Sequence, residues 1–90
     1  MVESELEVVN RLGLHARAAA KLVHLAGAFR SAVVLVTADG EEIDAKSILG
    51  ILLLAAGQGT RLTVRCVGSD EAEALNAVSA LFACRFGEGE

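Results

Sequence analysis

Two residues near the N-terminus pair a nucleophile with a phosphate-binding cation. His15 and Arg17 are separated by one residue and follow Gly13. A histidine side chain has an unperturbed pKa of about 6.5, so a neutral ring nitrogen is available as a nucleophile near pH 7. An arginine guanidinium binds phosphoryl oxygens through charge-assisted hydrogen bonds. The pair is chemically suited to carry a phosphoryl group on His15 with Arg17 as the stabilising cation. In so short a motif the other interpretation is a polar residue near a helix cap beside a solvated arginine.

The residues after His15 indicate that it stands at the start of a helix. Over 16–29 the apolar residues recur at helical spacing, and Arg17, Lys21 and His24 fall on the opposite, exposed face. The unpaired backbone N–H groups of the first helical turn would face an anion on the His15 ring. The predicted backbone donors are those of Ala16, Arg17 and Ala18.

Size and charge restrict the class of protein. Ninety residues with 53% hydrophobic content predict one domain over 1–90, with no room for a cleft between lobes. Any chemistry must then lie on the surface and be completed by a partner. A net charge of −4 without a basic run argues against nucleic acid. Because the N-terminus is acidic and no apolar run reaches about 18 residues, we expect a cytoplasmic protein without membrane insertion.

The remaining reactive side chains predict no cofactor and no metal. Cys66 and Cys84 lack CxxC spacing and a nearby histidine, so we expect two reduced thiols in the core. His24 lies about 13 Å of helix rise from His15, too far to act on the same phosphoryl group. Neither paired carboxylates nor a glycine-rich nucleotide loop is present in the sequence.

The order of elements predicts an α+β fold. Strands are expected over 4–9, 32–37, 41–45 and 62–66, with Asp39-Gly40 turning the central hairpin. Ser47 is a suitable N-cap for a helix that ends at Gly57 or Gly59, and Asp70-x-x-Glu73 predicts a capping box for the last helix. The alternating strands indicate one buried face, which all the helices must cover. A ferredoxin-like module has a similar order of elements, so the pattern alone leaves the strand order open.

Two separate motifs are similar to those of the HPr family, the histidine-containing phosphocarriers of the bacterial sugar phosphotransferase system. Gly13-Leu14-His15-Ala16-Arg17 with Ala19-Ala20-x-Leu22-Val23 resembles the phosphorylation motif of that family. Lys46-Ser47-Ile48-x-Gly50-Ile51-x-x-Leu54 resembles the segment around its regulatory serine. Gln58-Gly59-Thr60 before a strand also fits the family pattern. The similarity extends from about Leu6 to Phe82, over most of the chain.

The resemblance implies a relay in which the protein is a substrate of its partners and not an independent catalyst. Enzyme I would phosphorylate Nδ1 of His15, and an enzyme IIA domain would then receive the phosphoryl group. The implied fold is an open-faced β-sandwich in which three helices cover one side of an antiparallel sheet of strand order 1-4-2-3 (βαββαβα). Ala18 stands where the family usually has proline, so we expect a working site with an altered transfer rate or phosphohistidine lifetime.

The second predicted helix has both structural and functional interpretations. Ser47 is explained as an N-cap, and the resemblance adds phosphorylation by a dedicated serine kinase. An exposed apolar patch on this helix would serve partner docking, whereas Leu49, Leu53 and Ala56 are expected in the core. The predicted docking residues are Leu14, Ala20, Lys21, Lys46, Ile48, Ile51 and Leu52.

Three other functions are compatible with parts of the sequence. A regulatory relay, of the kind that serves nitrogen signalling, would use the same His15 site. An interaction module of the same fold that is not phosphorylated on histidine would be controlled through Ser47 alone, although retention of both His15 and Arg17 argues against it. A ferredoxin-like ligand-binding domain would show another strand order. We expect a monomer, since a diffusing carrier must expose His15 to successive partners.

Overall fold

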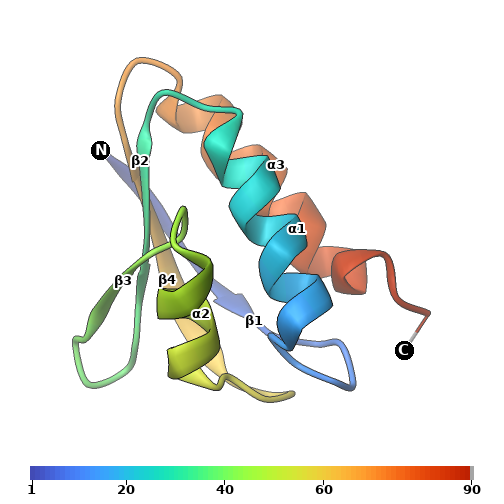
Figure 1. Ribbon diagram of the computed structural model, residues 1–90. Helices are drawn as coiled ribbons and strands as arrows, with labels where there is room; N and C mark the ends of the chain where they lie inside the picture. The colour runs from blue at the N-terminus through green and yellow to red at the C-terminus, as the bar shows by residue number, and fades with distance from the viewer. Residues whose placement is uncertain (90) are drawn as a thin grey trace.

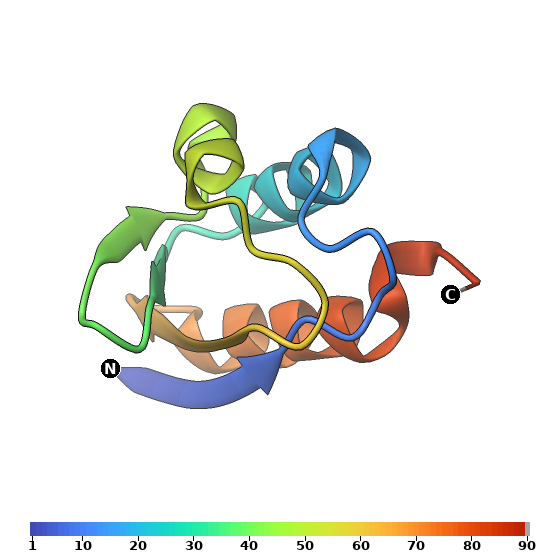
Figure 2. The ribbon, with the colours of Figure 1, turned by 90° about the horizontal axis from the view of Figure 1, so that it is seen from below.

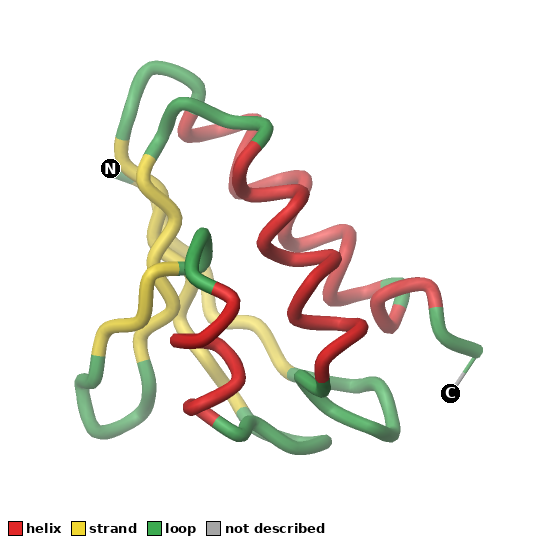
Figure 3. The backbone as a smooth tube through the Cα atoms, viewed as in Figure 1, coloured by secondary structure: helices red, strands yellow, loops and turns green. Residues whose placement is uncertain are grey.

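The computed structural model describes residues 1–89, so residue 90 of the predicted domain lies outside the described part. Strands and helices follow one another along the chain in the order that the sequence predicts (Figures 1 and 3). The elements are β1 (Val2–Glu7), α1 (Ala16–Gly27), β2 (Ala32–Val36), β3 (Glu42–Asp44), α2 (Ile48–Leu54), β4 (Arg61–Val67), α3 (Glu71–Ala83) and the short 3₁₀ helix η1 (Arg85–Gly87).

The four strands form one antiparallel sheet in the order β1-β4-β2-β3. Leu6 pairs with Leu62 across β1 and β4, and Val33 pairs with Cys66 across β2 and β4. This register places the apolar side chains of the strands on one face, because successive residues of a strand alternate between faces. The predicted open-faced sandwich is confirmed, and the strand order excludes the ferredoxin-like alternative.

The helices cover the apolar face and leave the other face of the sheet open. Figure 2 shows α2 next to α1, while α3 packs against β1 and β4. The open face carries ion pairs between neighbouring strands, such as Arg61 to Glu5 at 2.9 Å and Arg65 to Glu3 at 3.2 Å. Within residues 1–89, no helix is long and apolar enough to cross a membrane.

The two long helices bury the side chains that their periodicity predicts. In α1 the apolar stripe of Ala19, Leu22 and Ala26 is buried, while the polar face remains exposed. In α3 the buried residues are Ala74, Val78 and Phe82, with Leu75 and Leu81 partly buried. The buried side chains of both helices share one core with the strands, and this packing fixes the position of the first turn of α1 above the sheet.

Three local predictions need correction. The residue that ends α2 in a left-handed conformation is Ala55 (φ 54°) and not a glycine. Asp70 makes no side-chain cap for α3, because its carboxylate accepts hydrogen bonds from the backbone amides of Arg30 and Ser31, both at 2.9 Å, and from the Ser31 hydroxyl. Cys66 is buried as predicted, whereas Cys84 is exposed at the end of α3.

Candidate functional site

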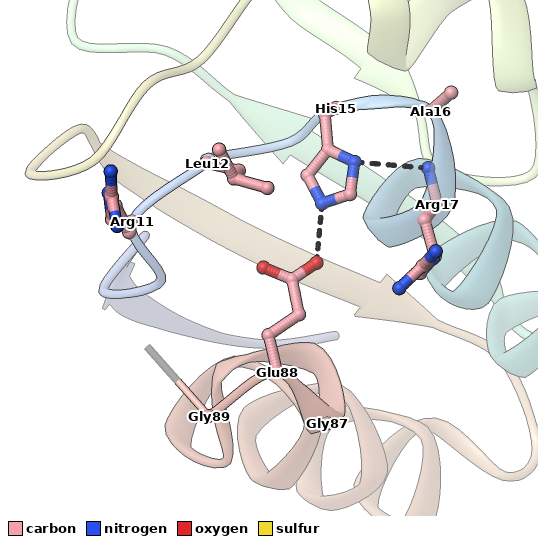
Figure 4. A pocket seen from close by; sticks show the side chains of 8 residues that line it. All are labelled: Arg11, Leu12, His15, Ala16, Arg17, Gly87, Glu88 and Gly89. Carbon is pink, nitrogen blue, oxygen red and sulfur yellow. Dashed lines mark hydrogen bonds and ion pairs between the residues drawn. The ribbon is translucent and has the colours of Figure 1, made fainter.

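His15 is the N-cap residue of α1. Its backbone is extended (φ −71°, ψ 179°), and its carbonyl accepts the first helical hydrogen bond from the amide of Ala19 at 2.8 Å. Serine, threonine, aspartate or asparagine usually supplies the side-chain acceptor at this position. Here the acceptor is the ring, since the backbone amide of Arg17 donates to Nδ1 at 3.3 Å (Figure 4). Of the three amides expected near the ring, the one that donates to it is that of Arg17.

The turn before His15 is fixed against the C-terminal end of α2. Gly13 has a left-handed backbone (φ 68°), and a Cβ atom there would lie 2.5 Å from the carbonyl oxygen of Ala56. The amide of Leu14 donates to that same oxygen at 2.8 Å, and the Leu14 side chain is buried. Only glycine fits this close approach, so it determines where His15 lies.

The other nitrogen of the ring meets a carboxylate from the C-terminal segment. Nε2 of His15 lies against Oε2 of Glu88 (Figure 4). Oε1 of Glu88 accepts a hydrogen bond from Nδ2 of Asn10 at 3.0 Å. Only 13% of the Glu88 side chain is exposed, so this contact is sheltered from solvent. The hydrogen bonds from Asn10 and from His15 lower the pKa of Glu88, which therefore carries a negative charge at neutral pH.

These two contacts assign the tautomer of His15. A backbone amide can only donate, so Nδ1 must present its lone pair towards Arg17. A carboxylate accepts, so Nε2 must carry the proton that faces Glu88. The resulting neutral ring has its nucleophilic lone pair on Nδ1. The Nδ1 bond is long for a hydrogen bond and is correspondingly weak, so an electrophile can displace it.

The ring faces an open pocket with a positive rim. Arg11 and Arg17 line it together with Leu12, Ala16 and Gly87, and Glu88 and Gly89 complete the lining (Figure 4). The first turn of α1 contains no acidic residue, so the positive end of the helix dipole is not neutralised there. The exposed Arg17 side chain extends from the first turn of α1 beside the ring (Figure 4). The pocket can therefore receive a doubly charged phosphoryl group.

Ser47 and Lys46 lie at the other end of α2 from His15. Ser47 is the predicted N-cap, since its hydroxyl oxygen accepts the amide of Gly50 at 3.1 Å. The opposite end of α2 contacts Leu14, so Ser47 is displaced from the site by roughly 10 Å of helix rise. Lys46 donates to the carbonyl of Phe29 at 2.9 Å, beyond the C-terminal end of α1. Lys46 is thus held away from His15 and does not rim the site.

The division of α2 into core and docking residues differs from the prediction. Ile51 is completely buried, whereas Leu49 and Leu53 are 64% and 76% exposed. Ile48 and Leu52 are exposed as predicted, Ala56 is in the core, and the predicted docking residue Leu14 is buried. Ile51, one turn after the N-cap Ser47, is the residue through which α2 packs into the core. Because α2 carries apolar residues of its own on every face, the sequence pattern did not reveal which face is buried.

Ala20 and Lys21 are exposed on α1, as the docking prediction requires. The ammonium of Lys21 donates to the backbone carbonyl of Phe86 at 2.6 Å and so ties the C-terminal segment to α1. Sequence reasoning missed Asn10 and Glu88 at the site. Nothing in their spacing to His15 indicates the contact, because Glu88 follows it by 73 residues. The only signal is an apolar residue, Phe86, placed beyond the last helix and just before an acid.

An open-faced sandwich with an unprotonated histidine nitrogen at the positive end of its first helix defines a small phosphocarrier domain. The family model described as "PTS HPr component phosphorylation site" matches residues 2–83. The chain belongs to the HPr family, and it is a phosphocarrier of the phosphotransferase system and not itself a catalyst. Family membership implies partners of the enzyme I and enzyme IIA types.

Relatives of known name agree with this assignment over the whole chain. The phosphocarrier protein HPr of Cupriavidus necator is 51% identical over 90 residues, covering 100% of both chains. The HPr of Xylella fastidiosa is 54% identical over 88 residues, covering 98% of each. Among solved structures, HPr-C-His from Thermoanaerobacter tengcongensis superposes with a TM-score of 0.95 at 38% identity, covering 100% of both chains.

Proposed function

We propose that Nδ1 of His15 accepts a phosphoryl group from phosphorylated enzyme I and donates it to an enzyme IIA domain for sugar uptake. The observation that carries the proposal is the orientation of the ring. Its unprotonated nitrogen faces the amide of Arg17 at 3.3 Å within a pocket that is open to solvent and lined by two arginines. A partner can therefore bring a phosphoryl group to Nδ1 without any rearrangement of the fold.

The acceptance step follows from these contacts. The Nδ1 lone pair attacks phosphorus, so an N–P bond forms while the bond from phosphorus to the donor group of enzyme I breaks. The amide of Arg17 is released from Nδ1 and donates to a phosphoryl oxygen instead, at the positive end of α1. The guanidinium of Arg17 adds a charge-assisted hydrogen bond to the same group. Donation to enzyme IIA is the reverse sequence, with the acceptor nucleophile attacking phosphorus.

Two further amides of the first turn belong to the proposed phosphate site, those of Ala16 and Ala18. Ala18 is completely buried, so its side chain contributes to the core while its amide stays in the first helical turn. A proline at this position would supply no N–H group. Ala18 thus adds a donor, and we expect it to alter the lifetime of the phosphohistidine or the rate of transfer, with the role of His15 unchanged.

Partner proteins are proposed to dock on α1 and α2 around His15. The α2 patch consists of Ile48, Leu49, Leu52 and Leu53, all exposed, and it lies beside α1 (Figures 1 and 2). Ala20 and Lys21 extend this surface along α1. Exposed apolar side chains of this kind mark a docking surface when charged residues surround them. Lys21 and Arg17 favour acidic partner surfaces.

Ser47 is proposed as a second, regulatory phosphorylation site for a serine kinase. A phosphate there would add a charge of about −1.5 to −2 next to Ile48 in the α2 patch. The α2 N-terminus tolerates this charge, whereas an apolar partner surface does not. Phosphorylation of Ser47 would therefore weaken docking without touching His15. We further propose that residues 1–90 act as one monomeric domain in the cytoplasm.

The phosphoacceptor is tested by measuring the intact mass after incubation with enzyme I, phosphoenolpyruvate and Mg²⁺. We expect one phosphoryl addition that mild acid removes, absent from His15→Ala. His24→Ala is the matched control, since His24 is exposed on the same helix beyond reach of the site. An acid-stable addition, or an addition that persists in His15→Ala, would contradict the proposal. Absence of any addition with enzyme I of the same organism would also contradict it.

A further inference from the structure

The chain beyond α3 turns back onto the start of α1 through a strained segment. Arg85, Phe86 and Gly87 all have positive φ angles, of 59°, 56° and 77°. Residues other than glycine rarely adopt this backbone conformation, because their Cβ atom comes too close to the following carbonyl oxygen. Strain of this kind persists only where surrounding contacts fix the backbone, and it concentrates at functional sites.

Two contacts hold the strained segment in place. The Phe86 side chain is completely buried, with its ring centroid 5.0 Å from that of Phe82 on α3. The carbonyl of Phe86 accepts a hydrogen bond from the ammonium of Lys21 on α1 at 2.6 Å. The C-terminal segment is therefore anchored on both long helices, directly before Glu88.

The anchored segment delivers the Glu88 carboxylate to His15 in a fixed orientation. One of its oxygens meets Nε2 of His15, and the other accepts from Nδ2 of Asn10 at 3.0 Å. Asn10 is itself buried, and it donates to the carbonyl of Gly13 at 2.7 Å. The orientation of the Asn10 amide is fixed, because exchanging its oxygen and nitrogen would set oxygen against both acceptors. Its buried oxygen has no partner among the described residues, which indicates that the two donations determine its position.

We infer that Glu88 is a positioning residue for phosphotransfer, whose carboxylate accepts the Nε2 proton of His15 and thereby keeps the lone pair on Nδ1. The inference rests on the proposed role of His15 as the phosphoryl acceptor. A carboxylate that holds one nitrogen of a functional histidine fixes both the tautomer and the direction of the ring. Glu88 touches the side of the ring that the phosphoryl group does not occupy.

The contact also stabilises the phosphorylated ring. When the N–P bond forms at Nδ1, the Nε2 proton stays in place and the ring acquires a positive charge. No proton has to leave during the step, since the attacking nitrogen carried none. The negative charge of Glu88 then faces the positive ring at Nε2, which favours acceptance of the phosphoryl group. Without Glu88, the ring would rotate more freely and its charge would be met by solvent alone.

The test compares Glu88→Ala and Glu88→Gln with Glu73→Gln, which removes the same charge from an exposed position on α3. Nuclear magnetic resonance of the unphosphorylated proteins detects the Nε2-bound proton of His15, which solvent exchange removes unless an acceptor shelters it. We expect this signal in the wild-type protein and in Glu73→Gln, a weaker signal in Glu88→Gln and none in Glu88→Ala. The amide oxygen of glutamine can still accept the proton, so partial rescue separates positioning from mere folding.

The same variants are assayed for phosphorylation by phosphorylated enzyme I. We expect kcat to fall about tenfold or more in Glu88→Ala, with KM for enzyme I unchanged, the size of loss seen when a carboxylate partner of a functional histidine is removed. An Nε2 proton signal that survives in Glu88→Ala, or transfer as fast as or faster than wild type, would overturn the inference while leaving the role of His15 intact. A wild-type protein that accepts no phosphoryl group would overturn the proposed function, and the inference with it.

Discussion

Replacing Gly13 with alanine introduces a methyl group where the structure has no space for one. The new Cβ would lie 2.5 Å from the carbonyl oxygen of Ala56 and 2.8 Å from Cα of Gly57, both backbone atoms. The left-handed φ of 68° adds about 1–2 kcal/mol for a residue other than glycine. Relief of the clash requires movement away from Ala56, which loses the 2.8 Å hydrogen bond from Leu14 and about 0.5–1.5 kcal/mol more. The free energy of unfolding should fall by about 1.5–3.5 kcal/mol in total.

Urea unfolding measures this loss directly. For a domain of this size the dependence on urea is about 1 kcal/mol per molar, so the midpoint should fall by about 1.5–3.5 M. Gly27→Ala is the matched control, because no atom lies within 4 Å of its added Cβ and its φ is not left-handed. That variant should be unchanged or more stable by up to about 1 kcal/mol. A Gly13→Ala loss below about 0.5 kcal/mol, or an equal loss in Gly27→Ala, would refute the reasoning.

Four further predictions concern residues elsewhere in the fold. Ser47→Ala should lower the free energy of unfolding by about 0.5–2 kcal/mol in thermal unfolding, because the amide of Gly50 loses its side-chain acceptor. Hydrogen bonds from the Ser31 hydroxyl and from the backbone amides of Arg30 and Ser31 lower the pKa of Asp70 from 3.8 to about 2. The Asp70 carboxylate therefore contributes its full stabilisation above about pH 4, and this stabilisation is lost as the pH falls towards 2. Asp70→Asn should remove this loss of stability, which urea unfolding between pH 7 and pH 2 measures. Ile51→Ala should lower the free energy of unfolding by about 2–5 kcal/mol, because Ile51 is completely buried. Leu53→Ser should change that free energy by less than about 0.5 kcal/mol. The same variant should bind enzyme I more weakly, which titration calorimetry measures.

The sequence predicted those parts of the fold that rest on local periodicity. The stripe of Ala19, Leu22 and Ala26 defines the buried face of α1 because polar residues separate its turns. The alternation in β4 likewise identified the inner side chains Leu62 and Val64. The buried face of α2 was not predictable in this way, since the helix carries apolar residues on every face. Its inward face depends on contacts with residues distant in sequence, which a local pattern does not contain.

In the candidate site, too, the sequence indicated the residues that are close together in the chain but not those that are far apart. His15 and Arg17 are two positions apart, so one helix start places both, and the family motif around them indicates phosphoryl chemistry. Glu88 reaches the ring because the strained turn at Phe86 directs the chain back after α3, and Asn10 donates a hydrogen bond to the other oxygen of the Glu88 carboxylate. A hydrogen bond from Lys21 of α1 to the Phe86 carbonyl holds that turn, and these two residues are 65 positions apart. The sequence therefore indicated the proposed reacting group and its cation but not the carboxylate that lies against the ring.

The measurement that tests the central claim most directly is the position of the phosphoryl group on the ring. Protein labelled with ¹⁵N and phosphorylated by enzyme I allows the coupling between phosphorus and each imidazole nitrogen to be observed by nuclear magnetic resonance. The account predicts coupling to Nδ1 of His15, with Nε2 still protonated against Glu88. A phosphoryl group on Nε2, or on any residue other than His15, would contradict it.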